Sequence, residues 1–315
     1  MCREESEGNE NCFGDQFKPR HIAAVVSETA LFSLVMVLAL FGNLLVCYAV
    51  YRNPRLRCPS NYYIISLALT DILQASCTIP LAVVFLATSF WPFGTPVCYV
   101  AAITKLSLVI TSLYTMTLMA LNRYYKIVKP SKYQAIFKKK FIVITTSVAW
   151  AIAIFVALLV AFVFGEGAKP SPLHAVCVLQ FDEITFPCVS LVFFTPYFII
   201  GFCYCKIYGV VKTHNANVSW QSSNVEDVKV SKTLLATVVG FVCLWLPAHV
   251  IYSVSILKGY SYFPRIVSLL ATFLGFTTSC VNPFIYGFMN RAFKSEFKKC
   301  LFRRKTHSVA AETST

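Results

Sequence analysis

Four polar residues lie inside long apolar stretches of this sequence and give its first chemical signal. They are Asn43, Asp71, Arg123 and Asn282. A charge buried in hydrocarbon costs about 2.5–3.5 kcal/mol even on the most lenient insertion scale, so it persists only where a partner offsets the cost. The pattern therefore predicts an internal polar network rather than a purely apolar core.

Another charge, Lys105, is expected on the same helix face as Arg123. Eighteen residues separate the two, and eighteen steps of about 100° make five whole helical turns. A desolvated ammonium at this position would attract a carboxylate, a phosphate or an acidic group of a peptide. The alternative is that Lys105 snorkels outward or pairs with an acidic residue of a loop. The candidates for that pairing are Glu166, Asp182 and Glu183.

Seven apolar stretches must position these side chains. At about 1.5 Å per helical residue, each is long enough to cross a bilayer core of roughly 30 Å. A hydrophobic fraction of 57%, a charged fraction of 13% and a mean hydropathy of +0.64 also favour a membrane protein. We predict an all-α membrane protein, a seven-transmembrane helix bundle. The expected spans are His21–Tyr51, Asn61–Thr88, Pro96–Val128, Phe141–Phe164, Ile184–Lys212, Val228–Leu257 and Pro264–Met289.

The basic residues predict the orientation of the bundle. Alternate connections carry twenty Lys and Arg residues, whereas the opposite connections carry six, and basic loops stay cytoplasmic. We expect a multi-pass plasma-membrane protein with an extracellular N-terminus (1–22), a bundle (23–290) and a cytoplasmic eighth helix and tail (291–315). Anionic lipids and a cytoplasmic partner then account for the net charge of +14 without nucleic acid.

Two of the thirteen cysteines are expected to form a disulfide. Cys98 begins the third span and Cys177 lies in the long loop before the fifth. Both face the oxidising side of the membrane, where disulfides persist. Cys2 and Cys12 are also extracellular and could bridge to each other or to Cys188, because sequence does not fix connectivity.

With these residues in place, the chain resembles the rhodopsin-like, or class A, G protein-coupled receptors over nearly its whole length. Each short motif is weak by itself, but seven in the right order and spacing are specific. The motifs are Gly42-Asn43, Leu67-Ala68-Leu69-Thr70-Asp71, Asn122-Arg123-Tyr124, Trp150, Pro196 with Tyr204, Phe241 with Trp245-Leu246-Pro247, and Asn282-Pro283-Phe284-Ile285-Tyr286.

The resemblance implies a receptor that transmits the binding of an extracellular ligand to a heterotrimeric G protein, and it implies an activation switch. Pro247 and Pro283 would kink their helices and act as hinges. Arg123 would pair at rest with an acid on helix six, for which Asp227 is in position. The residues assigned to the switch are Asn122, Arg123, Tyr124, Tyr204, Asp227, Phe241, Pro247, Asn282, Pro283 and Tyr286.

The resemblance also implies an allosteric sodium site at Asp71, Ser112 and Asn282. Oxygen ligands suit such a hard cation, which would offset the buried carboxylate and favour the resting state. The alternative is a protonated Asp71 that is hydrogen-bonded to Asn43 and Asn282. No other cofactor is expected.

One residue departs from the family pattern. Asn122 stands before Arg123, where most members carry an acid. Without the neighbouring carboxylate, Arg123 would be held less firmly, and we expect raised basal signalling.

For the ligand pocket, the resemblance indicates Lys105, Trp245, His249, Thr272 and Phe276. Amine receptors carry an acid at the position of Lys105, so an anionic small molecule, lipid or peptide is favoured over an amine. Trp245 would couple the pocket to Phe241, or it serves only in ordinary aromatic packing. Phe276 stands where an opsin needs its retinal-binding lysine.

The sequence leaves two alternative functions, a receptor for a neutral ligand and a transporter. Asn122-Arg123-Tyr124 is similar to the melatonin-receptor variant and keeps a neutral ligand open, although Asn282-Pro283 has the majority form. A transporter would also tolerate buried charges, but such proteins usually contain internal repeats and none relates the halves here. The sequence has no Gly-x-Ser-x-Gly or His-Glu-x-x-His motif, so an enzyme is not expected.

The predicted cytoplasmic segments suggest further partners. A short, polar connection at 213–225 would let a G protein helix dock between extended helices five and six. Residues 291–302 alternate basic residues with Phe293 and Phe297, as in a helix on the membrane surface. Cys300 in that helix is a candidate for palmitoylation. The Ser and Thr residues of the tail would serve a receptor kinase and arrestin, or are disordered.

Overall fold

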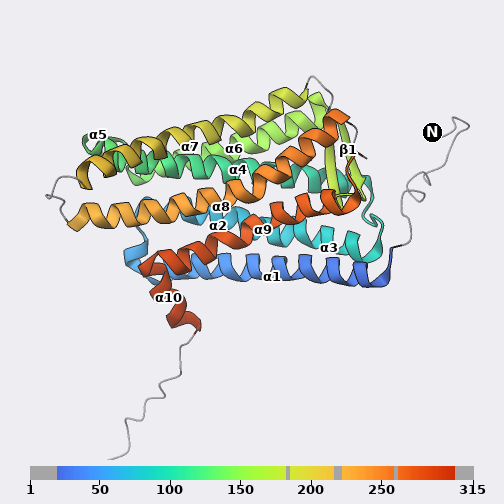
Figure 1. Cartoon of the computed structure of the whole chain (residues 1–315), viewed down its shortest axis with the longest axis horizontal. Helices are drawn as coiled ribbons and strands as arrows, with labels where there is room; N and C mark the ends of the chain where they lie inside the picture. Colours follow the sequence, from blue (N-terminus) through green and yellow to red (C-terminus); the bar gives the residue numbers. More distant parts are fainter. Residues whose placement is uncertain (1–19, 182–184, 216–221, 259–261, 302–315) are drawn as a thin grey trace, which may run out of the picture.

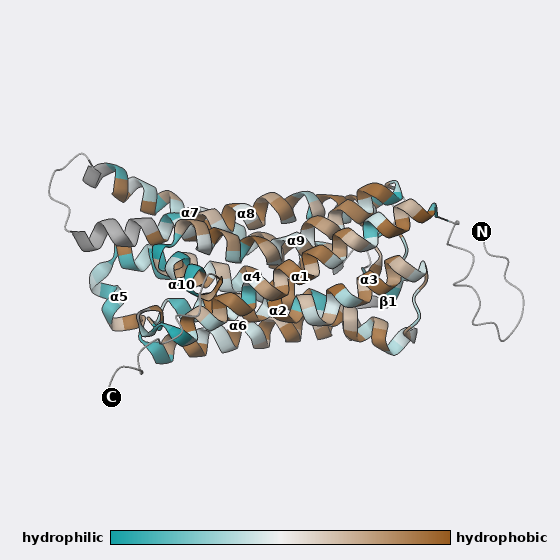
Figure 2. Ribbon diagram, turned by 90° about the horizontal axis from the view of Figure 1, so that it is seen from below, coloured by the Kyte–Doolittle hydropathy of each residue, from teal (hydrophilic) through white to brown (hydrophobic). Residues whose placement is uncertain are grey.

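The computed structural model of the chain describes residues 20–181, 185–215, 222–258 and 262–301. Within this part, seven helical segments are long and apolar enough to cross a membrane, which confirms the predicted bundle. They run alongside one another (Figure 1), and hydrophobic residues dominate along their length (Figure 2). The predicted spans agree with the observed ones to within two residues at either end.

The helices and strands follow one another without a second domain among the described residues. The second membrane span consists of three consecutive elements, α2, η3 and α3. A π-helical turn interrupts its α-helix just before Pro80, which lacks the N–H group that a regular α-helical turn needs. In chain order the elements are α1 (Ile22–Arg52), η2 (Pro54–Leu56), α2 (Asn61–Leu73), η3 (Gln74–Thr78), α3 (Ile79–Thr88), α4 (Gly94–Val128), α5 (Pro130–Ile136), α6 (Lys139–Leu159), η4 (Val160–Phe164), β1 (Gly165–Ser171), β2 (Val176–Phe181), α7 (Thr185–Asn215), α8 (Ser222–Lys258), α9 (Arg265–Met289) and α10 (Arg291–Leu301).

Helix α4 lies at the centre of the bundle. It packs against α2, α6, α7 and α8, while α9 packs against α1 and α8. Half of the membrane window of α4 and 61% of that of α9 is buried within the protein, compared with 28% for α1 and α6. The helices with the most protein around them, α2, α4 and α9, therefore also carry the buried polar residues Asp71, Arg123 and Asn282.

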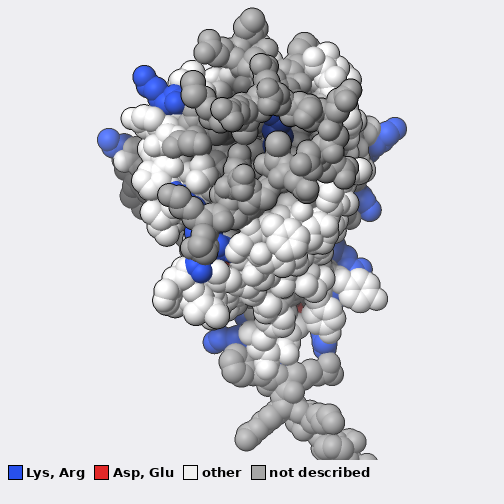
Figure 3. Space-filling view, turned by 90° about the vertical axis from the view of Figure 1, so that its right-hand side faces the viewer, with Lys and Arg blue, Asp and Glu red and all other residues white. Residues whose placement is uncertain are grey.

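A β-hairpin closes one end of the bundle, where the sequence predicted only a long loop. Strands β1 and β2 pair in antiparallel fashion, with Pro170 opposite Cys177. Cys177 is bonded to Cys98 of α4, which confirms the predicted disulfide. Cys188 is exposed and forms no disulfide with a described residue, whereas Cys2 and Cys12 lie outside the described residues. In the view onto this end, the part of the surface that belongs to described residues is largely uncharged, and most of the basic side chains lie at its margin (Figure 3).

The predicted amphipathic eighth helix is α10. Asn290 caps its start, because the side-chain Oδ1 accepts a hydrogen bond from the backbone N–H of Ala292 at 3.0 Å. Phe293 is fully buried against the ring of Tyr286. Glu296 accepts hydrogen bonds from Asn53 and Lys299 and so ties α10 to the end of α1.

Gly42 makes the close approach of α1 to α9 possible. A Cβ atom at this position would lie 2.9 Å from both Cβ and Cγ of Pro283, and a proline ring cannot move aside. We expect Gly42→Ala to lower the free energy of unfolding by about 1–3 kcal/mol, measured by thermal unfolding of the purified protein. Gly201→Ala is the control, because its Cβ would meet nothing within 4 Å. Equal effects of the two substitutions would show that the helix contact is not the cause.

Candidate functional site

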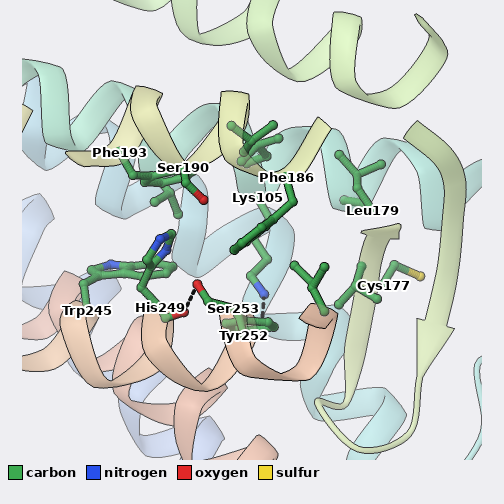
Figure 4. A pocket seen from close by; sticks show the side chains of 16 residues that line it. Lys105, Cys177, Leu179, Phe186, Ser190, Phe193, Trp245, His249, Tyr252 and Ser253 are labelled. Carbon is green, nitrogen blue, oxygen red and sulfur yellow. Dashed lines mark hydrogen bonds between the residues drawn. The ribbon is translucent and has the colours of Figure 1, made fainter. Parts of the chain in front are cut away.

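A cavity lies between α4, α7, α8 and β2, near the hairpin end of the bundle (Figure 4). About 800 Å³ of space between its walls holds no protein atoms, counting the part that is open to solvent. Most of the wall is apolar, as in known ligand pockets. The polar side chains that line it are Lys105, Ser190, His249, Tyr252 and Ser253.

Lys105 supplies the cationic group of this cavity. Its Nζ donates a hydrogen bond to the hydroxyl of Tyr252 at 3.2 Å. It also lies 5.2 Å from the ring centroid of Tyr252 and 5.8 Å from that of Phe276, within cation–π range. The ammonium is thus directed along the pocket wall by neutral groups. The acidic alternatives Glu166, Asp182 and Glu183 lie outside the side chains that the structure describes.

Three of the five expected pocket residues, Lys105, Trp245 and His249, line the cavity. The other two lie behind its wall. Thr272 places its Oγ1 3.1 Å from the hydroxyl of Tyr252, and the ring of Phe276 packs beneath Lys105. Both are buried, with 2% and 1% of their surface exposed. They act on the cavity by holding Tyr252 and Lys105 rather than by lining it.

His174, at the tip of the hairpin, covers the back of Tyr252. The two rings are stacked with centroids 4.6 Å apart, and the imidazole Nδ1 lies 2.9 Å from the hydroxyl of Ser171. Burial lowers the pKa of His174 to about 3, and the nearby charge of Lys105 lowers it in the same direction. The imidazole is therefore neutral at physiological pH.

Acid should destabilise the folded chain through His174. An unfolded histidine takes up a proton near pH 6.5, whereas the folded side chain does so only near pH 3. The free energy of unfolding should therefore fall below pH 6.5 by about 1.4 kcal/mol per pH unit. His174→Phe keeps a ring on Tyr252 but cannot titrate, so thermal unfolding as a function of pH should show a smaller acid effect. An identical pH dependence in both proteins would contradict this.

Trp245 lies at the inner end of the cavity. Its indole packs on Phe241, with ring centroids 6.1 Å apart. Gly275 of α9 lies beside it, and a Cβ there would be in ordinary van der Waals contact with the indole at 3.5 Å. Pro247 lies in α8 two residues further on. Trp245 therefore lines the cavity and precedes the proline of α8 by two residues.

A second, much smaller cavity lies below Trp245 around Asp71. The carboxylate is 4% exposed, and its Oδ2 accepts a hydrogen bond from Asn282 Nδ2 at 2.9 Å. The hydroxyls of Thr70 and Ser112, 2.9 Å apart, border the same cavity. One carboxylate among several hydroxyl oxygens is a donor set that fits sodium. Asn43 bonds instead to the carbonyls of Ala39 and Ser279, so only Asn282 of the expected pair bonds to Asp71.

Two residues expected in the activation switch lie at the other end of α4. Arg123 is 4% exposed and Asn122 is 1% exposed. The hydroxyl of Ser60 donates to Asn122 Oδ1 at 3.0 Å and lies 3.3 Å from that of Tyr133 on α5. Asp227 belongs to α8, but its side chain lies outside those that the structure describes.

Further residues expected in the switch lie on α4, α7 and α9. The rings of Tyr124 and Tyr125 meet edge to face at 5.4 Å. Tyr204 is largely buried in α7 and Tyr286 almost completely in α9. Pro283 lies within α9 beside Gly42. Cys300, near the end of α10, is half-buried.

Sequence reasoning missed two groups that shape the cavity. Tyr252 follows Trp245 by seven residues and His249 by three, a helical spacing that places all three on one face of α8. From that spacing, Tyr252 could have been predicted to lie at the cavity. The residues of β2 at the cavity, Cys177, Val178 and Leu179, carried no such signal, because their position depends on the hairpin fold.

Comparison with known proteins identifies the class. A family model described as "7 transmembrane receptor (rhodopsin family)" matches residues 42–286, which is most of the chain. The chain belongs to this family. It is a multi-pass membrane receptor of the G protein-coupled class, which responds to an extracellular ligand, and this decides against the transporter alternative.

The individual relatives have low sequence identity to the chain, between 20% and 28%. The histamine H2 receptor of Homo sapiens is 24% identical over 93% of this chain and 84% of its own length. The somatostatin receptor type 1 of Rattus norvegicus is 28% identical over 86% of this chain and 70% of its own length. Squid rhodopsin has a similar fold, with a TM-score of 0.80 at 20% identity over 91% of this chain and 88% of that one.

Proposed function

We propose that this receptor responds to an anionic ligand whose acidic group pairs with Lys105. The observation that carries the proposal is the ammonium of Lys105 in a largely apolar cavity, where the described partners are the hydroxyl of Tyr252 and two aromatic rings. A half-buried cation whose described neighbours are neutral gains most from a ligand of opposite charge. A small-molecule acid, an acidic lipid or an acidic peptide would supply it.

The relatives do not select a ligand by themselves, since the two cited are named for histamine and somatostatin. A ligand with an ammonium group would be repelled by Lys105. A neutral, melatonin-like ligand remains the second candidate, and the apolar wall of the cavity is the observation that favours it.

We further propose that the inner residues transmit binding to the G protein. Ligand contact at Trp245 would move Phe241 and change the bend of α8 at Pro247. Sodium at Asp71, Ser112 and Asn282 would stabilise the resting state. Trp245 borders both cavities and packs on Phe241, which borders the smaller one, and these contacts support the coupling.

Asn122 is expected to raise basal signalling. No carboxylate stands beside Arg123 at this position, and Asn122 receives its described hydrogen bond from Ser60. Asn122→Asp would add a charged partner for Arg123 worth about 1–2 kcal/mol, or roughly 5- to 30-fold in the resting–active equilibrium. Ligand-free G protein activation at equal surface expression should fall accordingly. Asn122→Gln, which adds no charge, should leave it high, and an unchanged basal rate in Asn122→Asp would refute the idea.

The orientation and the remaining partners also belong to this proposal. The excess of basic residues in alternate connections supports an extracellular N-terminus. The amphipathic α10, with Lys298 and Lys299 in its last turn, supports contact with anionic lipids and palmitoylation of Cys300. Arrestin and a receptor kinase would act on the tail beyond α10, which lies outside the described residues.

The test is a ligand screen on membranes from cells that express the chain, with nucleotide exchange on added G proteins as the readout. Carboxylate lipids, acidic metabolites, peptides, amines and neutral indoles would be compared with membranes that lack the chain. Activation by an acid supports the proposal. Activation by amines or neutral indoles alone would overturn it and leave only the receptor class.

A further inference from the structure

His249 lines the cavity and carries a buried polar atom that no described residue satisfies. Its Nε2 is buried and has no hydrogen-bond partner among the described residues. The imidazole is held between the rings of Phe193 and Phe194, both with centroids 5.2 Å away. The side chain lines the cavity between Trp245 and the Lys105–Tyr252 pair (Figure 4). A buried polar atom without a partner is unfavourable, and a ligand that forms a hydrogen bond with it removes that cost.

Ser190, which lines the cavity from α7, carries a second such atom. Hydroxyls on helices often donate to the carbonyl four residues earlier, as Thr195 does to Leu191 at 2.8 Å and Ser253 to His249 at 2.7 Å. Ser190 does not, and its Oγ has no partner among the described residues. A hydroxyl turns freely about its side-chain bond, so this group can face into the cavity.

These two atoms lie apart from the cationic group. Ser190 and His249 face each other from α7 and α8, whereas the ammonium of Lys105 points toward Tyr252 (Figure 4). Between and around them the wall is apolar. The cavity thus has a charged pole and a neutral hydrogen-bonding pole, joined by apolar surface.

We propose that the ligand is a largely apolar carboxylic acid with a hydroxyl group on its apolar part, and that Ser190 and His249 hold this hydroxyl. A neutral imidazole offers one donor and one acceptor, and a serine hydroxyl offers both. A ligand hydroxyl can donate to one and accept from the other, whereas a carbonyl can only accept. The inference rests on the proposed role of Lys105 for the acidic group and adds a second determinant of specificity.

The experiment uses dodecanoic acid, its positional mono-hydroxy and mono-oxo isomers, and the methyl ester of each. G protein activation would be measured in membranes that hold equal amounts of wild type, Ser190→Ala, His249→Phe and Lys105→Gln. In the wild type, at least one hydroxy isomer should be about tenfold more potent than both dodecanoic acid and its oxo analogue. His249→Phe keeps a ring between Phe193 and Phe194, so dodecanoic acid should keep its potency to within about threefold.

The ratio of potencies, hydroxy acid to parent acid, separates specific binding from a structural role. It should fall to about one in Ser190→Ala and His249→Phe, and it should persist in Lys105→Gln, where both acids weaken together. Equal weakening of both acids in His249→Phe would overturn the inference, as would a wild type that prefers no hydroxy isomer or responds to no member of the series. If esters match acids in the wild type, the role of Lys105 fails instead, and the hydroxyl preference among the esters still tests this inference.

Discussion

Replacing Lys105 with glutamine should make an acidic agonist at least about 30-fold less potent. Loss of one member of a buried, hydrogen-bonded charge pair costs about 2–5 kcal/mol, and about 1.4 kcal/mol is a factor of ten. The amide keeps a neutral hydrogen-bonding group on this side chain but offers no charge to a carboxylate. The measurement is the concentration of the acid that gives half-maximal G protein activation, at equal surface expression.

Two further substitutions serve as controls for this result. Lys105→Arg keeps the charge and should retain most of the potency, although the guanidinium has a different shape. Lys169→Gln removes an exposed lysine of the hairpin and should leave the potency unchanged. If Lys105→Gln behaves like Lys169→Gln, then the acid binds elsewhere.

Removing the disulfide should cost the most stability of any single change considered. Cys98 and Cys177 are 79 residues apart in the chain, and closing a loop of that size contributes about 4 kcal/mol in the chain-entropy model. Cys177→Ser should therefore lower the thermal unfolding midpoint and the amount of protein at the cell surface. Ligand affinity should fall as well, because Cys177, Val178 and Leu179 of β2 form part of the cavity wall.

The matched control is Cys188→Ser. Cys188 is exposed on α7 and forms no disulfide with a described residue, so its substitution should change neither the unfolding midpoint nor surface expression. Equal losses in Cys177→Ser and Cys188→Ser would mean that the disulfide is not what holds the hairpin.

The bundle was predictable because its signals are local. Length and hydropathy define each span, and the disulfide followed from two cysteines on the same side of the membrane. The hairpin was not predictable in this way. Gly165–Ser171 is rich in glycine and polar residues, and it becomes a strand only by pairing with β2, which the bond to Cys98 holds against α4.

The position of a site residue was predictable where it depends on the geometry of a single helix. The angle between Lys105 and Arg123 placed Lys105 toward the interior, where it lines the cavity. Thr272 and Phe276 were expected to line the cavity too, but α8 places Tyr252 in front of them. That order depends on how α8 and α9 pack, which no periodicity within one helix encodes. His174 reaches Tyr252 only through the hairpin.

The most direct test of acid binding at Lys105 and of its transmission to a G protein is a structure of the receptor with an activating acid and a G protein bound. If the acid pairs with Lys105, a carboxylate oxygen should lie within about 2.7–3.2 Å of Lys105 Nζ. A G protein helix should lie between the cytoplasmic ends of α7 and α8. An acid bound away from Lys105, with the ammonium still bonded only to Tyr252, would contradict this pairing.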